Sequence, residues 1–324
     1  MSHHAPAMAT QIRPYDRTAL AEAAALIRAG EPVAVPTETV YGLAADATNA
    51  TAVARIYEAK GRPAFNPLIV HVADLAMAQT LVAFSPLAER LAAAFWPGAL
   101  TMVLPRLLDS PVAELASAGL PTLAVRLPSH PAMRALIVAA GVPLAAPSAN
   151  RSGAISPTRA THVLASLGGR IPLILDAGPT SEGVESTIVR PEADRVMVLR
   201  PGPITRDAIE RAAGVPAVRL SGSESTAEEG GVTAPGQLAS HYAPSKPLAL
   251  DCAAPAPDQF HIGFGPGPCQ RNLSERGDLV EAAANLFAAL HEADDSACPR
   301  ISVAPVPMIG IGVAINDRLA RAAA

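Results

Sequence analysis

Cysteine, aromatic residues and long apolar runs are all scarce in this sequence. Its 324 residues include 3 cysteines, Cys252, Cys269 and Cys298, and only 3% are aromatic. An odd number of cysteines without zinc-type spacing argues against a disulfide framework and favours a reducing compartment. No apolar run approaches the roughly 20 residues that cross a bilayer, and the N-terminus has no apolar signal core. We therefore expect a soluble cytoplasmic protein with no membrane partner.

A surplus of positive charge is also missing. The chain has 25 lysines and arginines against 29 acidic residues, a net charge of −4. This balance argues against a chain held to nucleic acid by bulk charge, although a local basic groove remains possible. Half of the residues are hydrophobic and 32 are proline, so short elements can enclose a core of Ala, Val, Leu and Ile. The length suggests two domains.

Apolar segments of strand and helix type alternate along most of the chain, which predicts an α/β fold with a mixed sheet. Expected strands begin at 33 and span 67–72, 99–104, 122–127, 142–146, 172–178, 185–190, 195–202, 259–264 and 301–306. Expected helices span 18–29, 51–59, 131–140, 278–291 and 315–323, and two more start at the Ser–Pro pairs 85–86 and 156–157. The stretch 221–236 has almost no large apolar residues and is typical of a linker.

The stretch 33–46, VAVPTETVYGLAAD, combines a strand with a polar loop. The apolar strand breaks at Pro36, and the loop then carries hydroxyl groups on Thr37 and Thr39. Such a loop in an α/β chain is typical of the mouth of a sheet, where ligands bind, but it is also compatible with an ordinary edge turn. Glu38, between the two threonines, is interpreted as a brace for the loop.

Several cationic residues lie where elements end. Lys60 and Arg62 flank a glycine after a helix, where they could complement the helix dipole or clamp a phosphate. Arg126 ends an apolar strand, and an unpaired buried arginine costs several kcal/mol, so we expect it at a rim or waiting for an anion. His71, at the end of another strand, is compatible with a core histidine.

Side chains with neutral hydrogen-bond donors also lie where strands begin or end. Ser148 and Asn150 come directly after a strand, in a loop that suits phosphate or sugar oxygens but also an ordinary turn. Ser186 precedes a strand and Arg200 ends one. No nucleophilic triad, metal cluster or Walker loop accompanies them. Such a set predicts a site for a polyanion and a carboxylate, with chemistry by positioning and charge neutralisation.

The chain contains, in this order, PTETVYGLAADA, KGRPAFNPLIVHV, FWPGALTMVL, TLAVRLPSHP, APSANRSGAISPT, GVESTIVR and LRPGPI. Together these motifs resemble the YrdC-like family of threonylcarbamoyl-AMP synthases. APGQLASHYAPSKPL and AINDRL resemble its long form. The resemblance implies a large YrdC-like twisted mixed-sheet domain with an open cleft at 13–214, a linker at 215–246 that closes over the active site, and a small Rossmann-like α/β domain at 247–324.

The resemblance also implies a reaction. A nucleotidyltransferase of this family makes threonylcarbamoyl-adenylate from L-threonine, bicarbonate and ATP, and releases pyrophosphate. The product passes to the tRNA threonylcarbamoyltransferase machinery, which modifies the adenosine next to the anticodon; weak contact with tRNA is also expected. Mg2+ would arrive on the phosphates of ATP, with no metal ligands from protein side chains.

Site residues are carried over motif by motif. The catalytic set is Lys60, Arg62, Ser148 and Asn150. ATP contacts are expected from Arg62, Asn66, Thr122, Ser148, Ser156, Arg200 and Tyr242. Threonine contacts are expected from Thr37, Thr39, His71, Arg126, the backbone at Ala146, and Ser186.

Two other functions remain as alternatives. An RNA-binding YrdC-like module without catalysis would share the fold, but the charge balance and the complete polar set argue against it. A carbamoyl-transfer role in metallocentre maturation is the other. Proteins of that class add acylphosphatase and zinc-finger segments, and this sequence contains neither.

Overall fold

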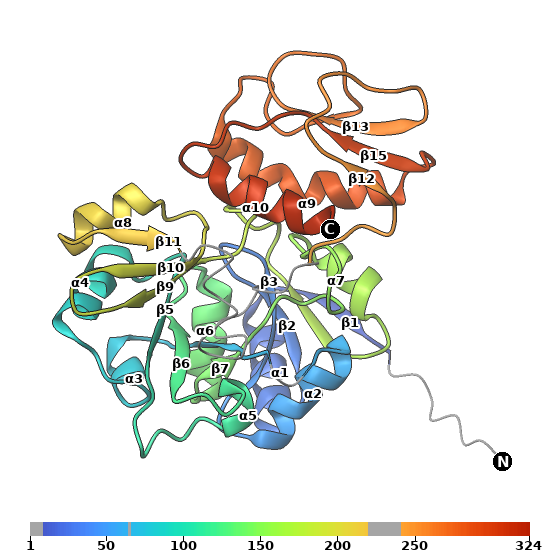
Figure 1. Ribbon diagram of the computed structural model, residues 1–324. Helices are drawn as coiled ribbons and strands as arrows, with labels where there is room; N and C mark the ends of the chain where they lie inside the picture. Colours follow the sequence, from blue (N-terminus) through green and yellow to red (C-terminus); the bar gives the residue numbers. More distant parts are fainter. Residues whose placement is uncertain (1–8, 64–65, 220–240) are drawn as a thin grey trace.

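The chain is described by a computed structural model over residues 9–63, 66–219 and 241–324. A large body holds most of these residues, and a smaller C-terminal body lies against it (Figure 1). The linker-like stretch 221–236 lies outside the described residues. The predicted domain boundaries stay a prediction, although one strand, β11 (Ala217–Arg219), lies beyond position 214 and still joins the large sheet.

Eleven of the described strands form one mixed sheet, in the order β1-β8-β2-β3-β7-β4-β6-β5-β9-β10-β11. They are β1 (Gln11–Pro14), β2 (Val33–Pro36), β3 (Tyr41–Asp46), β4 (Ile69–His71), β5 (Leu100–Pro105), β6 (Thr122–Arg126), β7 (Leu144–Ala145), β8 (Leu173–Asp176), β9 (Thr187–Pro191), β10 (Val196–Arg200) and β11. Parallel pairs such as β4–β6 adjoin antiparallel pairs such as β5–β6. The predicted mixed α/β architecture is therefore confirmed.

Helices cover both faces of this sheet (Figure 1). They are α1 (Arg17–Arg28), α2 (Ala50–Lys60), α3 (Leu75–Gln79), α4 (Pro86–Phe95), α5 (Glu114–Ser117), α6 (Pro131–Ala140), α7 (Ala160–Leu167) and α8 (Arg206–Ala213). Alternate residues of β2 feed two separate apolar clusters: Val33 and Val35 pack with α1 and α6, whereas Ala34 joins the cluster that includes α2 and α4. This alternation is the period-two pattern of a strand buried on both faces.

One predicted helix start is wrong. The Ser156–Pro157 pair does not begin a helix, because α7 starts at Ala160 and has Arg159 as its N-cap. The hydroxyl of Ser156 donates a 2.5 Å hydrogen bond to the carboxylate of Glu185 and is not available for capping. The equivalent prediction at Ser85 is confirmed, since its hydroxyl accepts from the backbone N–H of Ala88.

The C-terminal body is a small parallel sheet with two helices on the side that faces the large body (Figure 1). Its elements are β12 (Leu248–Ala249), β13 (Gln259–Gly263), β14 (Arg271–Asn272), α9 (Leu279–Asp295), β15 (Arg300–Val303) and α10 (Gly312–Ala322). The predicted βαβ unit is confirmed by the parallel pairing of β13 and β15 on either side of α9. Val40, Ile155 and Val184 of the large body are part of its apolar cluster, so the two bodies share a core.

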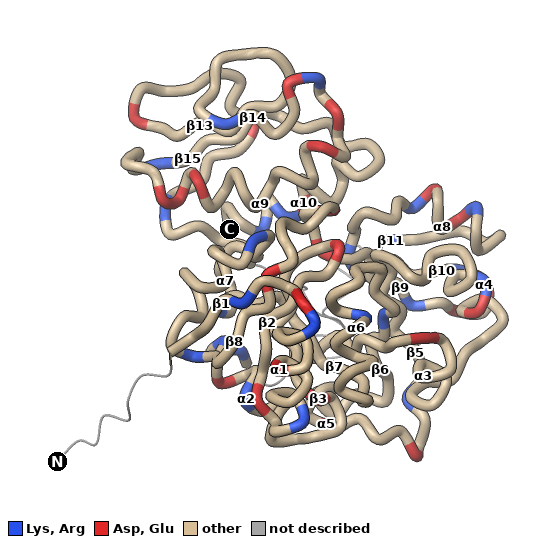
Figure 2. Tube along the Cα trace, turned by 180° about the vertical axis from the view of Figure 1, so that it is seen from behind, with Lys and Arg blue, Asp and Glu red and all other residues tan. Residues whose placement is uncertain are grey.

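Charged residues of both signs are scattered over both bodies in the view of Figure 2. Within the described residues, no helix has the length and apolar character needed to span a bilayer. The three cysteines are unpaired and partly buried.

Candidate functional site

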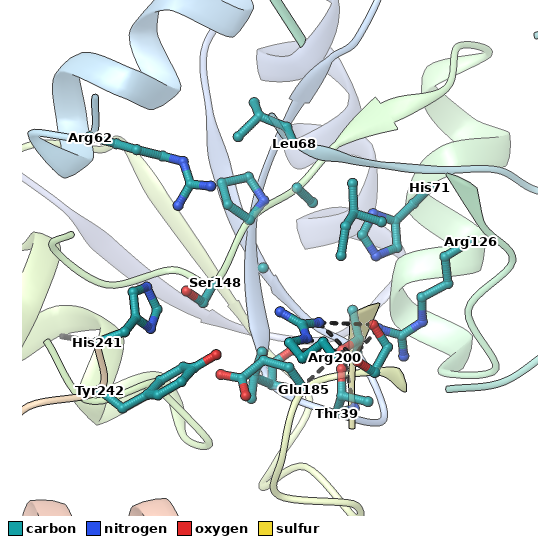
Figure 3. A pocket seen from close by; sticks show the side chains of 17 residues that line it. Thr39, Arg62, Leu68, His71, Arg126, Ser148, Glu185, Arg200, His241 and Tyr242 are labelled. Atoms are coloured by element: carbon teal, nitrogen blue, oxygen red, sulfur yellow. Dashed lines mark hydrogen bonds between the residues drawn. The ribbon is translucent and has the colours of Figure 1, made fainter. Parts of the chain in front are cut away.

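A pocket opens beside the carboxyl ends of β4, β6 and β10, and its empty space, open solvent at the mouth included, is about 560 Å³ (Figure 3). The described residues that line it are Thr37, Thr39, Val40, Gly42, Arg62, Leu68, Ile69, His71, Arg126, Ala146, Pro147, Ser148, Glu185, Ser186, Arg200, His241 and Tyr242. Arg62, Ser148, His241 and Tyr242 lie toward one end, and His71, Arg126 and Thr39 lie toward the other (Figure 3). The pocket therefore has two chemically distinct ends.

The turn between β2 and β3 is built around a hydroxyl group. Thr37 Oγ1 donates to Val40 O at 2.7 Å and accepts from the backbone N–H groups of Thr39 and Val40. It also lies 2.9 Å from Thr39 Oγ1, which accepts from Arg126 Nη1 at 2.9 Å. Thr37 thus braces the turn, and Thr39 joins that turn to the arginine.

Parallel pairing brings His71 and Arg126 together. They are register partners at the carboxyl ends of β4 and β6, and ends of parallel strands meet at one edge of a sheet. Arg126 is buried, Nε donates to Gly98 O at 3.1 Å, and Nη2 lies 2.6 Å from Glu38 Oε1. The predicted rim position is therefore wrong, because Arg126 is buried and pairs with Glu38, whereas its binding of a ligand anion stays a prediction.

Arg200 and Ser186 form the wall between the two ends. Arg200 comes from the end of β10, and its Nε and Nη2 donate to Ser186 O at 3.1 and 3.0 Å. The Ser186 hydroxyl accepts from Nη2 at 3.2 Å and lies 2.8 Å from Thr101 Oγ1. These bonds fix the start of β9 against the end of β10.

Lys60 and Arg62, at the end of α2, have different roles in the structure. Gly61 ends the helix at φ 60°, a left-handed conformation that favours glycine, and so turns Arg62 into the pocket. Burial, offset in part by nearby tyrosines, lowers the pKa of Arg62 to about 10. Lys60 is buried behind it and donates to Ser148 O at 2.6 Å and Asn150 O at 2.5 Å. Lys60 therefore holds the loop that presents Ser148.

Residues of the C-terminal body support the pocket from behind. Arg318 of α10 is fully buried, and its Nε lies 2.7 Å from Glu185 Oε2. Its guanidinium also lies 5.3 Å from the ring centre of Tyr242 and 2.9 Å from Asp317 Oδ2. Burial alone would raise the pKa of Glu185, but Arg318 and Arg200 overcome it and hold that pKa below its ordinary value. Glu185 is therefore an anion.

Three buried polar atoms at the pocket have no hydrogen-bond partner among the described residues. They are Nδ1 of His71, Nδ1 of His241 and the hydroxyl of Tyr242. Tyr242 also has φ 66°, a conformation that costs about 1–3 kcal/mol for a residue other than glycine. Unsatisfied polar groups and backbone strain concentrate where a ligand binds, which identifies this pocket as the candidate site.

Most of the predicted site residues meet here, and their individual roles stay predictions. Those that line the pocket are Thr37, Thr39, Arg62, His71, Arg126, Ala146, Ser148, Ser186, Arg200 and Tyr242. The residues predicted for the site that do not line it are Lys60, Asn66, Thr122, Asn150 and Ser156. Thr122 starts β6 at the end opposite Arg126, whereas Ser156 contacts the pocket residue Glu185.

Sequence reasoning missed Glu185, His241 and Arg318 and left Glu38 as a loop brace. Each lies within a motif that carries the family resemblance: PTET contains Glu38, GVEST contains Glu185, HYAP contains His241 and AINDRL contains Arg318. The resemblance assigned these four residues no contact with a substrate. Their partners lie far along the chain, so no local spacing indicated them.

The contact between the two bodies includes a stacked histidine pair, which predicts acid sensitivity. His162 and His291 have ring centres 3.9 Å apart and an interplanar angle of 26°. Burial, with His291 and Arg159 nearby, lowers the pKa of His162 to about 3, and burial lowers that of His291 as well. In the unfolded chain both return to about 6.5, so the unfolded state binds more protons below that pH. Stability should therefore fall as the pH drops from about 6.5 toward 3.

His162→Phe tests this pair because it keeps a stacked ring and removes one titrating group. We expect the drop in melting temperature between about pH 7.5 and about pH 5 to be smaller in this variant than in the parent. Thermal denaturation at the two pH values measures it. An equal drop in both proteins would assign the acid sensitivity to other groups.

The sequence profile of the Sua5/YciO/YrdC family, described as telomere recombination, matches residues 25–202. A second profile, described as the C-terminal domain of threonylcarbamoyl-AMP synthase, matches residues 204–324. The threonylcarbamoyl-AMP synthase of Bacillus subtilis (strain 168) is 42% identical over 324 residues, covering 94% of this chain and 92% of the relative. The protein of that name from Pyrococcus abyssi (strain GE5 / Orsay) is 39% identical, covering 93% and 92%.

Solved structures agree with the sequence matches. The crystal structure of P. abyssi Sua5 complexed with L-threonine has a TM-score of 0.86 and 36% identity, and covers 98% of this chain and 97% of that one. E. coli YciO, at 21% identity and a TM-score of 0.52, covers 60% of this chain and 96% of its own, and shows the fold alone. The chain therefore belongs to the Sua5/YciO/YrdC family, in the long form that carries the C-terminal domain of threonylcarbamoyl-AMP synthases.

Proposed function

We propose that the pocket joins L-threonine, bicarbonate and ATP into threonylcarbamoyl-AMP and releases pyrophosphate. The observation that carries this proposal is a single pocket with a cationic end and a charge-balanced end, lined by buried polar atoms without partners. Relatives with this activity in their names match along more than nine tenths of the chain. The P. abyssi relative was crystallised with L-threonine.

The charge-balanced end suits the amino acid. Arg126 lines this end, and its guanidinium, held by Glu38, Thr39 and Gly98, offers a fixed positive charge to the α-carboxylate of threonine. His71 presents an unpartnered Nδ1 to the same space, and burial, with Arg126 nearby, lowers its pKa to about 3. His71 is therefore neutral at physiological pH and offers a hydrogen bond without a charge. Thr39, Ser186 and the backbone at Ala146 complete the predicted threonine contacts.

The cationic end suits the nucleotide. Arg62 and Arg200 carry charge to the pocket wall, and Ser148 adds a hydroxyl group. The Tyr242 hydroxyl, without a described partner, faces the same end (Figure 3). A buried guanidinium that lacks a carboxylate, as Arg62 does among the described residues, gains most from a phosphate, which it binds with two parallel hydrogen bonds.

Positioning and charge neutralisation account for the chemistry. The ammonium group of threonine first gives a proton to solvent. The neutral amine then attacks the carbon of bicarbonate, and loss of water leaves a carbamate. A carbamate oxygen then attacks the α-phosphorus of ATP, and pyrophosphate leaves. Among the described pocket residues, neither His71 nor Glu185 has a pKa near neutrality, since both values are lowered. We therefore assign the rate enhancement to proximity and to the arginines that face the leaving group.

Mg2+ is the proposed cofactor, carried by ATP. The donor set fits an ion bound through phosphates and water, because the carboxylate that lines the pocket, Glu185, is already held by Arg318 and Ser156. Within the described ranges, no group of three His, Cys, Asp or Glu side chains is arranged for a metal. When bound, the ion would neutralise phosphate charge beside Arg62 and Arg200.

The product is proposed to pass to the tRNA threonylcarbamoyltransferase machinery, and three unpaired cysteines support a reducing, cytoplasmic setting. Contact with tRNA would be weak, since charges of both signs are scattered over the chain (Figure 2). An RNA-binding module without catalysis gains no specific support from the pocket.

The test is substrate-dependent pyrophosphate release. With purified protein, ATP and magnesium, we expect release only when L-threonine and bicarbonate are both present. Coupled phosphate detection after pyrophosphatase measures the rate, and mass spectrometry identifies the adenylate. Release that ignores threonine, or no release beside tight RNA binding, would contradict the proposed function.

A further inference from the structure

Glu38 pairs with Arg126 but does not itself line the pocket. Its Oε1 lies 2.6 Å from Arg126 Nη2 and accepts from Ser129 N at 3.1 Å, and its Oε2 accepts from His130 N at 3.3 Å. Glu38 is 5% exposed and is absent from the lining of the pocket, whereas Arg126 is part of it. The carboxylate therefore acts on a ligand through Arg126 and through its own charge, without contact.

The charge of this pair is fixed. Burial alone would raise the pKa of Glu38, but Arg126 and two backbone N–H groups overcome it and lower that pKa to about 2. His71 beside the pair is neutral. Glu182 is half-buried near Glu38, and because it is a carboxyl group it supplies no cation to this end of the pocket. Arg126 and Glu38 thus balance each other's charge at the threonine end, whereas Arg62 at the other end has no carboxylate partner among the described residues.

A neutral, buried end favours a ligand that is itself neutral overall. An amino-acid zwitterion brings a carboxylate to Arg126 and a positive amine into the negative field of Glu38. A carboxylate without an amine would add an uncompensated negative charge to a site whose arginine is already paired, and burial makes such a charge costly. Resting on the proposed function, we propose that Glu38 is a specificity-determining residue, which makes the site select α-amino acids over carboxylates that lack the amine.

Two ligands measure this selection directly. (R)-3-Hydroxybutyrate is L-threonine without its amine, with the same hydroxyl-bearing carbon. Calorimetric titration gives the Kd of each ligand, and the ratio of the two is the selectivity. In Glu38→Gln, which keeps the shape and removes the charge, the selectivity should fall by at least tenfold. A smaller fall would overturn the proposal.

Two further variants keep the result interpretable. Glu192→Gln makes the same change in a carboxylate that pairs with Arg190 and Arg195 and is absent from the pocket lining, and it should leave the selectivity unchanged. Glu182→Lys, at a half-exposed position, adds a positive charge near Glu38 and should lower the selectivity even if Glu38→Gln fails to fold. Unchanged selectivity in Glu182→Lys together with an unfolded Glu38→Gln would overturn the proposal.

Failure of the proposed function has a different signature. It would appear as an unaltered protein that binds no threonine and releases no pyrophosphate with threonine and bicarbonate. Failure of the inference alone would appear as an active protein whose selectivity does not depend on the charge at Glu38.

Discussion

Arg318→Met should abolish most of the activity, although Arg318 lies in the C-terminal body and is absent from the pocket lining. The substitution leaves the buried carboxylate of Glu185 without the guanidinium that lies 2.7 Å away. Removing one partner of a buried ion pair costs about 3–5 kcal/mol. It also removes the cation near the Tyr242 ring. We expect the free energy of unfolding to fall by about that amount and pyrophosphate release to fall at least about 100-fold.

Denaturant unfolding and pyrophosphate release at saturating substrates measure the two effects. Arg276→Met is the matched control, because its side chain is 83% exposed and its ion pair with Glu281 spans 3.6 Å. That control should change stability by less than about 1 kcal/mol. The double variant Arg318→Met/Glu185→Gln should recover stability but not activity. Full activity in Arg318→Met would show that the C-terminal body does not support the pocket through this residue.

Gly183→Ala should separate the two bodies at the loop that leads to Glu185. A Cβ atom at Gly183 would lie 2.3 Å from Ala283 O and 2.4 Å from Ala284 Cα, both in the backbone of α9. Backbone cannot move aside as a side chain can, so α9 must withdraw from this loop. Gly183 also has φ 70°, which adds about 1–2 kcal/mol of strain for alanine. We expect lower stability and a loss of pyrophosphate release of at least about tenfold.

Gly178→Ala provides the comparison for this variant. Gly178 lies earlier in the same connection and has φ 85°, but an added Cβ there meets nothing within 4 Å. It carries the backbone strain without the collision with α9. The difference between the two variants in the free energy of unfolding and in turnover therefore measures the effect of the collision with α9 alone. Equal losses at the two glycines would assign the effect to strain alone.

Local signals in the sequence predicted the elements well. Ser85 caps α4 through the backbone N–H of Ala88, and α6 spans Pro131–Ala140 as predicted, since residues within one or two turns specify such elements. β1 was missed because none of its four residues is fully buried. It also pairs with β8, which lies far along the chain. α8 was missed as well, although Thr205 caps it, because its eight residues bury just Ile209 and Ala213.

The site was predictable as a set of residues but not as a set of pairs. Motif positions and strand ends predicted that Thr39, His71, Arg126 and Ser186 would meet, and parallel pairing explains why they do. The predicted rim position of Arg126 was wrong, because the residue is buried and paired. Its partner Glu38 stands on another strand connection, and nothing in the local pattern indicates which charge lies behind a strand end.

The stretch VAVPTETVYGLAAD shows the same division. Its sequence by itself determined a strand, a proline break, a polar turn and a second strand, because these depend on residues a few positions apart. Only the tertiary structure decided that Thr39 accepts a hydrogen bond from Arg126 and that Glu38 pairs with the same arginine. The physical reason is that burial and ion pairing depend on residues far apart in sequence, which folding alone brings together.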